Sequence, residues 1–427
     1  MSRQPLNFVV LGGSFAGLSI AHYFLDHIIH ELGTFEDAPT YRVILISPST
    51  HLFWNICAPR ALVSPNLIDP EHAFVPIEPA FSRHPFNEFT FIQGWATAVD
   101  TSARKITIET SNPRDVSYRP TSDRHGKYRT IPYHALVIAT GSSHRSPLYS
   151  LHGIHEETLA EMRAFHARLQ TANSIFIVGG GPSGVETAGQ LAIHFNKKNK
   201  LRKLLSPRKP KTITLISGGS RLLPRLNPKT SKKAERQLKN LGVHVVHNLR
   251  QLSSTVNTDG SSNCILNNDM TITSDLLIQA TGVYPNTRFL PPSMLDEAGY
   301  VATDRETLRI LGPSVGDRIY AVGDCAAYSK NYILDVYEPI PSLMKNLQND
   351  LLAHEYRLQT IEALEDAHFH QNPTDTQLMP ITRFGGVGVA FGWRVPSFMV
   401  WVIKRRDYAM GKAKGSAERG ANPFAVK

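Results

Sequence analysis

A glycine-rich turn contains the residues whose types and spacing most clearly suggest chemistry. The run Gly179-Gly180-Gly181-Pro182-Ser183-Gly184 follows a short apolar stretch and opens a segment with helical spacing of apolar residues. Gly179 would allow the tight bend, Gly181 would let a pyrophosphate approach the backbone, and Gly184 would let the helix pack on the strand. The helix N-terminus then offers N–H donors to the phosphates. The turn therefore predicts a dinucleotide site.

An earlier turn repeats this pattern with one departure. Gly12, Gly13 and Gly17 keep their places, but Ser14 stands where the middle glycine is expected. The serine hydroxyl can serve a phosphate, while its Cβ limits how closely the backbone can be approached. We therefore expect a second dinucleotide site here.

The strand that follows each turn ends in a serine instead of the usual acid. An Asp or Glu at this position normally holds the adenosine ribose, whereas this chain has Ser47 and Ser217. A carboxylate would repel a 2′-phosphate and Ser217 does not, while Arg221 could pair with one. We expect NADPH to be tolerated or preferred, and a merely solvated Arg221 remains the alternative.

Three further strand-like runs end in small residues that suit a nucleotide site. Two end in Ala-Thr-Gly, at Thr140-Gly141 and at Gly282, and the third ends in Gly323-Asp324. A carboxylate at a strand end can accept hydrogen bonds from ribityl hydroxyls, so Asp324 is the candidate ligand of a flavin side chain.

Two residues are candidates for catalysis. Glu186 lies just after the second turn and could assist proton handling near nicotinamide and flavin. Lys345 lies early in an expected helix over 341–354 and could add positive charge beside a reduced flavin. A plain structural role remains open for each of them.

The elements that must position these residues form two βαβ units. Apolar runs over 7–11 and 41–46 flank the first turn, and runs over 174–178 and 212–216 flank the second. The units stand too far apart in sequence to be halves of one sheet. The predicted fold class is α/β, with two Rossmann-like dinucleotide-binding domains and a C-terminal region.

Composition narrows the class of protein further. The 427 residues are 41% hydrophobic and 19% charged, which excludes a wholly disordered chain. The 3 cysteines are widely spaced, so we expect neither a disulfide framework nor a metal site. A net charge of +10 favours an anionic partner such as a nucleotide. No apolar run of about 20 residues and no targeting segment is seen, which favours a cytoplasmic protein, free or at a membrane surface.

In their order along the chain, these motifs resemble those of the pyridine nucleotide-disulfide oxidoreductase flavoproteins. Within that superfamily the chain looks most like the AMID/ferroptosis-suppressor branch of apoptosis-inducing-factor-like proteins, which resemble the type II NADH dehydrogenases in activity. The segments 51–61 and 385–392 support this likeness.

The resemblance implies bound FAD, reduction by NAD(P)H and delivery of electrons to a quinone. Positions 12, 17 and 324 would then serve FAD, and positions 179, 181 and 184 the nicotinamide nucleotide. Asn55 and Arg60 lie on a segment that passes near the flavin in this family. Disulfide reductases carry a cysteine pair there, but this chain has Cys57 alone, which excludes a dithiol relay.

The expected domains follow from the same layout. Residues 1–148 and 292–358 form a discontinuous FAD domain, residues 149–291 form an inserted NAD(P)H domain, and residues 359–427 form a C-terminal region that packs on the flavin side. Trp393, Phe398, Met399 and Trp401 beside Lys404-Arg405-Arg406 suggest peripheral membrane contact. Packing of these apolar residues on the flavin domain is the alternative.

Two other functions remain open at this stage. The first is a redox-sensing protein that binds DNA through the basic stretch 197–211, which is disfavoured because that stretch lacks interleaved aromatic residues. The second keeps the reductase chemistry but passes electrons to a biosynthetic intermediate. Oligomerisation also stays open.

Overall fold

The computed structural model describes residues 4–34, 38–110, 127–196, 210–356, 364–404 and 407–425. Most of the basic stretch 197–211, together with Arg405 and Arg406, lies outside these described residues.

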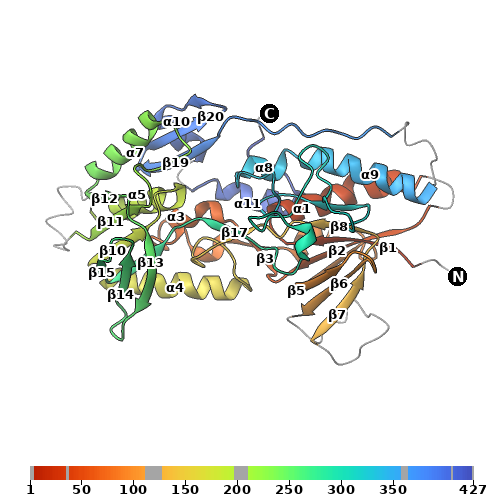
Figure 1. The fold of residues 1–427 in the computed structure, drawn as a ribbon, viewed down its shortest axis with the longest axis horizontal. Helices are drawn as coiled ribbons and strands as arrows, with labels where there is room; N and C mark the ends of the chain where they lie inside the picture. The colour runs from red at the N-terminus through yellow and green to blue at the C-terminus, as the bar shows by residue number, and fades with distance from the viewer. Residues whose placement is uncertain are drawn as a thin grey trace.

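A seven-stranded sheet carries the first glycine-rich turn (Figure 1). Its strands stand in the order β18 (Ile319–Ala321), β8 (Ala135–Ile138), β1 (Leu6–Leu11), β2 (Tyr41–Ser47), β5 (Phe89–Asp100), β6 (Lys105–Thr110) and β7 (Tyr128–Pro132). The strands from β18 to β5 pair in parallel, and β6 and β7 extend the sheet in antiparallel fashion. The buried apolar runs of β1 and β8 suit a parallel sheet that is covered on both faces.

A second sheet carries the other turn, and its strands fall between β8 and β18 in sequence. Its four parallel strands are β12 (Val243–His247), β11 (Thr212–Ser217), β10 (Ser174–Val178) and β16 (Leu276–Gln279). An antiparallel sheet of β13 (Gln251–Val256), β14 (Ser262–Leu266) and β15 (Thr271–Ser274) accompanies it. The predicted α/β class, with two separate Rossmann-like sheets, is confirmed.

The helix after each turn packs closely on its strand because the glycines lack a side chain. The helix α1 (Phe15–Tyr23), continued by η1 (Phe24–Ile28) and α2 (Ile29–Leu32), follows the first turn, and α5 (Pro182–Phe195) follows the second. A Cβ on Gly17 would lie 1.8 Å from the carbonyl oxygen of Gly12, and one on Gly184 would lie 2.0 Å from that of Gly179. Gly12 and Gly179 themselves have φ of +115° and +126°, a region that L side chains rarely adopt.

The C-terminal region contacts both halves of the molecule, including the side on which the sequence predicts that it packs. The strands β19 (Gln377–Thr382), β20 (Gly385–Ala390) and β21 (Trp393–Arg394) with α10 (Ser397–Lys404) lie against α5 and α7 (Pro228–Asn240). The chain then returns, and α11 (Ala413–Arg419) packs on α1 (Figure 1). The Ser19 hydroxyl donates to the carbonyl of Gly420 over 2.8 Å, and the His22 ring contacts the carbonyl of Ala417.

Among the described helices, none combines the length and the apolar character that crossing a membrane would require.

Replacing Gly17 by alanine should destabilise the fold, because the new Cβ would meet the Gly12 carbonyl at 1.8 Å. Overpacking of this kind costs about 2–3 kcal/mol, which urea unfolding followed by circular dichroism would detect as a lower midpoint. Gly411→Ala is the matched control, because nothing lies within 4 Å of its added Cβ. Equal midpoints for the two variants would contradict the close approach.

Candidate functional site

One cleft of about 900 Å³ is lined by residues from both sheets. The first turn contributes residues 12–16 and the second contributes residues 181–183. The ends of β2, β8 and β18 and the segment after β16 complete most of the wall. Because the carboxyl ends of parallel strands meet at this edge in each sheet, the cleft has the position expected for dinucleotides.

The cleft brings together more than half of the sequence-predicted site residues. Those that line it are Gly12, Gly13, Ser14, Ser47, Asn55, Thr140, Gly141, Gly181, Gly282, Gly323 and Asp324. Those that do not line it are Gly17, Arg60, Gly179, Gly184, Glu186, Ser217, Arg221 and Lys345. Three of the latter, Gly17, Gly179 and Gly184, take part instead in the close contact between helix and strand described above.

The middle position of each turn fits a phosphate. An added Cβ on Gly181 would meet nothing within 4 Å, so the space beside this backbone is open to a ligand. Ser14 is exposed at the equivalent place and caps α1 without a hydrogen bond from its side chain. Both helices therefore present free N-terminal N–H groups toward the cleft, which suits pyrophosphate.

The two strand-end serines hold the turns together. Ser47 Oγ accepts a long hydrogen bond from the backbone N–H of Ser49, and Ser217 Oγ donates to the carbonyl of Arg221 over 3.1 Å. Added Cβ atoms on Gly13 and Gly180 would lie 2.7 Å and 2.6 Å from these hydroxyls. In both turns, therefore, the hydroxyl of the strand-end serine packs against the second glycine.

Asp324 follows β18 and faces the cleft as a half-buried carboxyl group. Burial raises its pKa from an ordinary value of 3.8 to about 6. The hydroxyl of Ser142 opposes this rise by donating to Oδ2 over 3.2 Å. The group can therefore change charge near neutral pH, and it needs hydrogen-bond donors to be stable as a carboxylate.

Glu186 lies buried on α5 and faces the C-terminal region. Lys404 Nζ of α10 lies 2.9 Å from Oε1 of Glu186. Burial raises the pKa of the Glu186 carboxyl, and the Lys404 ammonium opposes that rise. A catalytic role for Glu186 stays a prediction, because the side chain does not line the cleft.

Arg60 connects the segment before the cleft to α5. It lies buried on α3 (Ala58–Ala61) and donates from Nε and Nη2 to Oε1 of Gln190, at 3.0 and 2.8 Å. Its guanidinium also lies 5.0 Å from the ring centre of Tyr408. The neighbouring Asn55 does reach the cleft, so only one of the two residues predicted on this segment lies where a cofactor could touch it.

Lys345 is exposed on α9 (Ile340–Tyr356), and no described residue of this helix lines the cleft. The shorter α8 (Ile333–Tyr337), which precedes it, contributes Ile333 and Val336 to the wall instead. The roles predicted for Lys345 and for the helix N-terminus therefore remain predictions.

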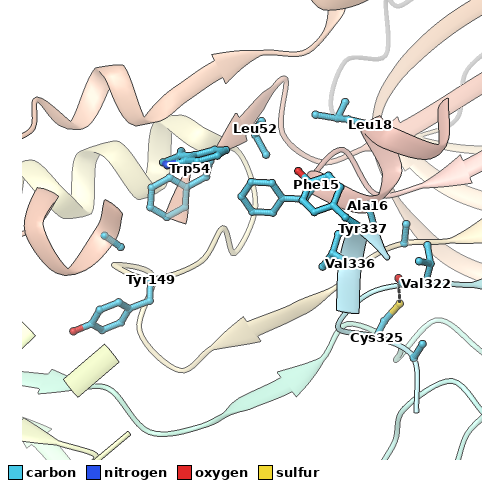
Figure 2. Close-up of a cluster of buried hydrophobic side chains, with 14 of the residues drawn as sticks. Phe15, Ala16, Leu18, Leu52, Trp54, Tyr149, Val322, Cys325, Val336 and Tyr337 are labelled. Atoms are coloured by element: carbon cyan, nitrogen blue, oxygen red, sulfur yellow. Dashed lines mark hydrogen bonds between the residues drawn. The ribbon is translucent and has the colours of Figure 1, made fainter. Parts of the chain in front are cut away.

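The floor of the cleft is an apolar cluster, part of which Figure 2 shows. Phe15 of the first turn meets Trp54 edge to face at 5.4 Å between ring centres. Trp54 is fully buried and donates from Nε1 to the carbonyl of Tyr408 over 3.0 Å. Val322 and Val336 close the same floor and line the cleft (Figure 2).

The cysteines are separate, buried thiols. Cys57, Cys264 and Cys325 are all unpaired. Burial raises the pKa of Cys57 to about 12, so this thiol stays protonated at neutral pH.

Two groups of side chains that could ligate a metal lie outside the cleft in the described part of the chain, and one of them is His134, His354 and Glu355. The other holds an arginine guanidinium. His22, Asp26 and His84 lie close enough to share an ion. Arg83, however, pairs with both carboxylate oxygens of Asp26 and lies 3.1 Å from Nδ1 of His22. The guanidinium thus neutralises this group.

Several lining residues escaped the sequence analysis. Those with polar or aromatic side chains include Trp95, His144, Arg225, Tyr284, Arg288, Lys330, Tyr332 and Gln377. Arg225 stands four residues after Arg221 in the same turn, so a search for cations beyond the strand end could have found it. Gln377 comes from the C-terminal region, and no local sequence signal indicates its place.

A family model described as pyridine nucleotide-disulphide oxidoreductase matches residues 6–349. Oxidoreductase phnG of Penicillium herquei is 36% identical over 418 residues, which cover 96% of this chain and 95% of that protein. Oxidoreductase ptaL of Pestalotiopsis fici is 29% identical, with 93% and 95% covered. The fold is similar to that of NDH2 from Plasmodium falciparum, at a TM-score of 0.64 and 16% identity, with 98% of both chains covered.

The match confirms the two cofactors that the sequence predicts, FAD and NAD(P)H. The open phosphate position at Gly181, the free helix N-termini and the Asp324 carboxyl fit these groups.

FAD binding should strengthen as pH rises through about 6. Ribityl hydroxyls donate to the ionised form of Asp324, so binding favours loss of the proton whose pKa is about 6 without ligand. The affinity of flavin-free protein should rise about tenfold from about pH 5 to about pH 8, as fluorescence titration would measure.

The same raised pKa of Asp324 makes the flavin-free fold more stable at low pH. This stabilisation is complete below the ordinary pKa of 3.8 and is lost as pH rises through about 6. Asp324→Asn should flatten both profiles. A flavin affinity that keeps its pH dependence in this variant would rule out Asp324 as the titrating ligand.

Proposed function

We propose that this chain, which belongs to the pyridine nucleotide-disulphide oxidoreductase family, passes electrons from NAD(P)H through FAD to a quinone. The observation that carries this proposal is the single cleft shared by both glycine-rich turns and Asp324. Two dinucleotides held by those turns would extend into the same space. The AMID-like branch and the domain boundaries given above belong to the same proposal.

The protein's part in this reaction is orientation and exclusion of water. Gly181 and the start of α5 would hold the pyrophosphate of the nicotinamide nucleotide, and residues 12–14 would hold that of FAD. Asp324 would accept hydrogen bonds from the ribityl chain. A bound FAD would supply the chemistry of hydride acceptance and electron transfer. Because Cys57 is a lone, buried thiol, the acceptor would meet the flavin directly.

An anaerobic titration tests donor and acceptor in sequence. The purified protein should absorb near ~450 nm, lose this absorbance on addition of NADPH or NADH, and recover it with a water-soluble quinone. A colourless protein that does not take up FAD would refute the proposal. Reduction without recovery by any quinone would leave the oxidoreductase in place and reject the acceptor.

Gly181→Ala sharpens this test, because an added Cβ would enter open space without disturbing the fold. The variant should keep its flavin and its thermal midpoint, yet need about tenfold more nucleotide for half-reduction. Gly411→Ala should behave as the unaltered protein.

We further propose that the C-terminal region lies on a membrane surface, where quinones dissolve. Phe384, Trp393, Phe398 and Trp401 form an aromatic patch with exposed fractions of 64, 82, 62 and 37%. Phe384 and Trp401 meet at 6.3 Å between ring centres. Exposed aromatic residues beside cations suit the interface between lipid and water.

Of the cations that the sequence indicates, Lys404 is described, whereas Arg405 and Arg406 lie outside the described residues. The ammonium group of Lys404 pairs with the buried carboxylate of Glu186 and is therefore not free to meet a lipid headgroup. Among the described residues of the same region, Arg383 and Arg394 are exposed cations, and Arg383 lies 5.1 Å from the ring centre of Phe384.

Flotation with anionic vesicles tests the membrane contact. The unaltered protein should float with the vesicles, and a Phe398→Ser, Trp401→Ser double variant should stay behind. Phe86→Ser is the control, because this residue is 92% exposed outside the aromatic patch. Failure of the unaltered protein to float would end the proposal, as would a dimer that the double variant dissociates.

A further inference from the structure

The turn that follows β11 is the place where a nicotinamide nucleotide's adenosine ribose would lie. Ser217 ends this strand, and the sequence from Ser217 to Pro228 contains no Asp or Glu. The turn is tied to the cleft, because the N–H of Leu223 donates to the carbonyl of Gly180 over 2.8 Å and Leu223 itself lines the cleft. A negative group at the ribose would therefore meet no carboxylate of this turn.

A second arginine, which the sequence analysis missed, reaches the same turn from the neighbouring strand. Arg250 follows β12, the strand that pairs in parallel with β11. Its Nε donates to the carbonyl of Gly218 over 3.2 Å. A Cβ on Gly218 would lie 3.0 Å from Cγ of Arg250, so the arginine stem lies across the turn where the glycine has no side chain.

The backbone around Arg250 is fixed before any ligand arrives. Its N–H donates to Oδ1 of Asn267 and its carbonyl accepts from the N–H of Asn267, each over 2.9 Å. Leu249 donates to the carbonyl of Ser217 over 3.0 Å, and Asn248 donates to that of Gly219 over 3.1 Å. These bonds join residues 248–250 to residues 217–219 and hold the exposed guanidinium beside the strand end.

Arg221 approaches from the other end of the turn. The hydroxyl of Ser217 donates to its carbonyl, and its own Nη2 donates to the carbonyl of Pro224 over 2.7 Å. One acid of the neighbouring helix α7, Glu235, is already paired with Lys239 at 2.7 Å and with His247 at 3.1 Å. The charge of the turn is therefore positive.

We infer that Arg250, together with Arg221, binds the 2′-phosphate of NADPH and makes this nucleotide the preferred electron donor. The inference rests on the proposed function, and it adds a specificity-determining residue that local sequence motifs do not indicate. Two guanidinium groups that flank a strand end without a carboxylate provide the planar donors that phosphate binding favours.

Calorimetric titration of the FAD-loaded protein with 2′,5′-ADP and with 5′-ADP tests the inference without turnover. The two ligands differ only in the 2′-phosphate, so their affinity ratio measures the contribution of that group. The unaltered protein should bind 2′,5′-ADP at least about tenfold more tightly, as a charge-assisted hydrogen bond implies. Arg250→Gln should reduce this ratio about tenfold while leaving 5′-ADP affinity within about twofold.

Three further variants complete the test. Arg250→Lys keeps the charge and should recover part of the ratio, whereas Ser217→Asp should invert it by repelling the 2′-phosphate. Arg236→Gln removes an exposed charge from α7 and should leave both affinities unchanged.

The outcomes separate this inference from the proposed function. A ratio near one in the unaltered protein, or an Arg250→Gln variant that keeps the full ratio, would overturn the inference. If NADH still reduces the flavin in that case, the proposed function survives. If neither nucleotide reduces the flavin, the proposed function fails instead.

Discussion

The cleft depends on two close contacts between backbone segments, each of which leaves no room for a side chain. In each βαβ unit the carbonyl of the first glycine lies where a Cβ of the last glycine would stand, at 1.8 Å for Gly17 and 2.0 Å for Gly184. This contact brings each helix N-terminus over the end of its strand, so that unpaired N–H groups from two sheets face one space. The phosphate positions and the opposing strand ends follow from it.

A buried ion pair joins the C-terminal region to α5. The carboxylate of Glu186 lies inside the protein on α5 and is stable as an anion only beside a cation, because unpaired buried charge is strongly unfavourable. Lys404 supplies that cation from the end of α10. Gln190, one turn further along α5, accepts from Arg60 and donates to the carbonyl of Pro380. One helix thus connects the cleft-side segment with β19.

The sequence predicts what is local and repeated, and it misses what depends on tertiary packing. Both glycine turns, the strands around them and the serines at 47 and 217 were predictable, because strand, turn and helix follow within about thirty residues. Lys404 looked like a surface cation, since nothing near it in sequence indicates a buried acid on α5. Arg250 was missed because its place follows from the parallel register of β11 and β12. The role of Lys345 stays a prediction: a helix start was expected at the flavin, and the structure places residues of α8 in the wall of the cleft.

The path of the carboxyl-terminal chain has a mechanical consequence. It contacts the second sheet's helix α5 through Lys404, meets Trp54 beneath the cleft through the carbonyl of Tyr408, and reaches the first sheet's helix α1 at Gly420. A hinge rotation of one sheet against the other would have to stretch or detach this crossing segment. The segment therefore acts as a tether. Resistance to rotation of one sheet against the other comes from these contacts, which lie outside the nucleotide-binding turns.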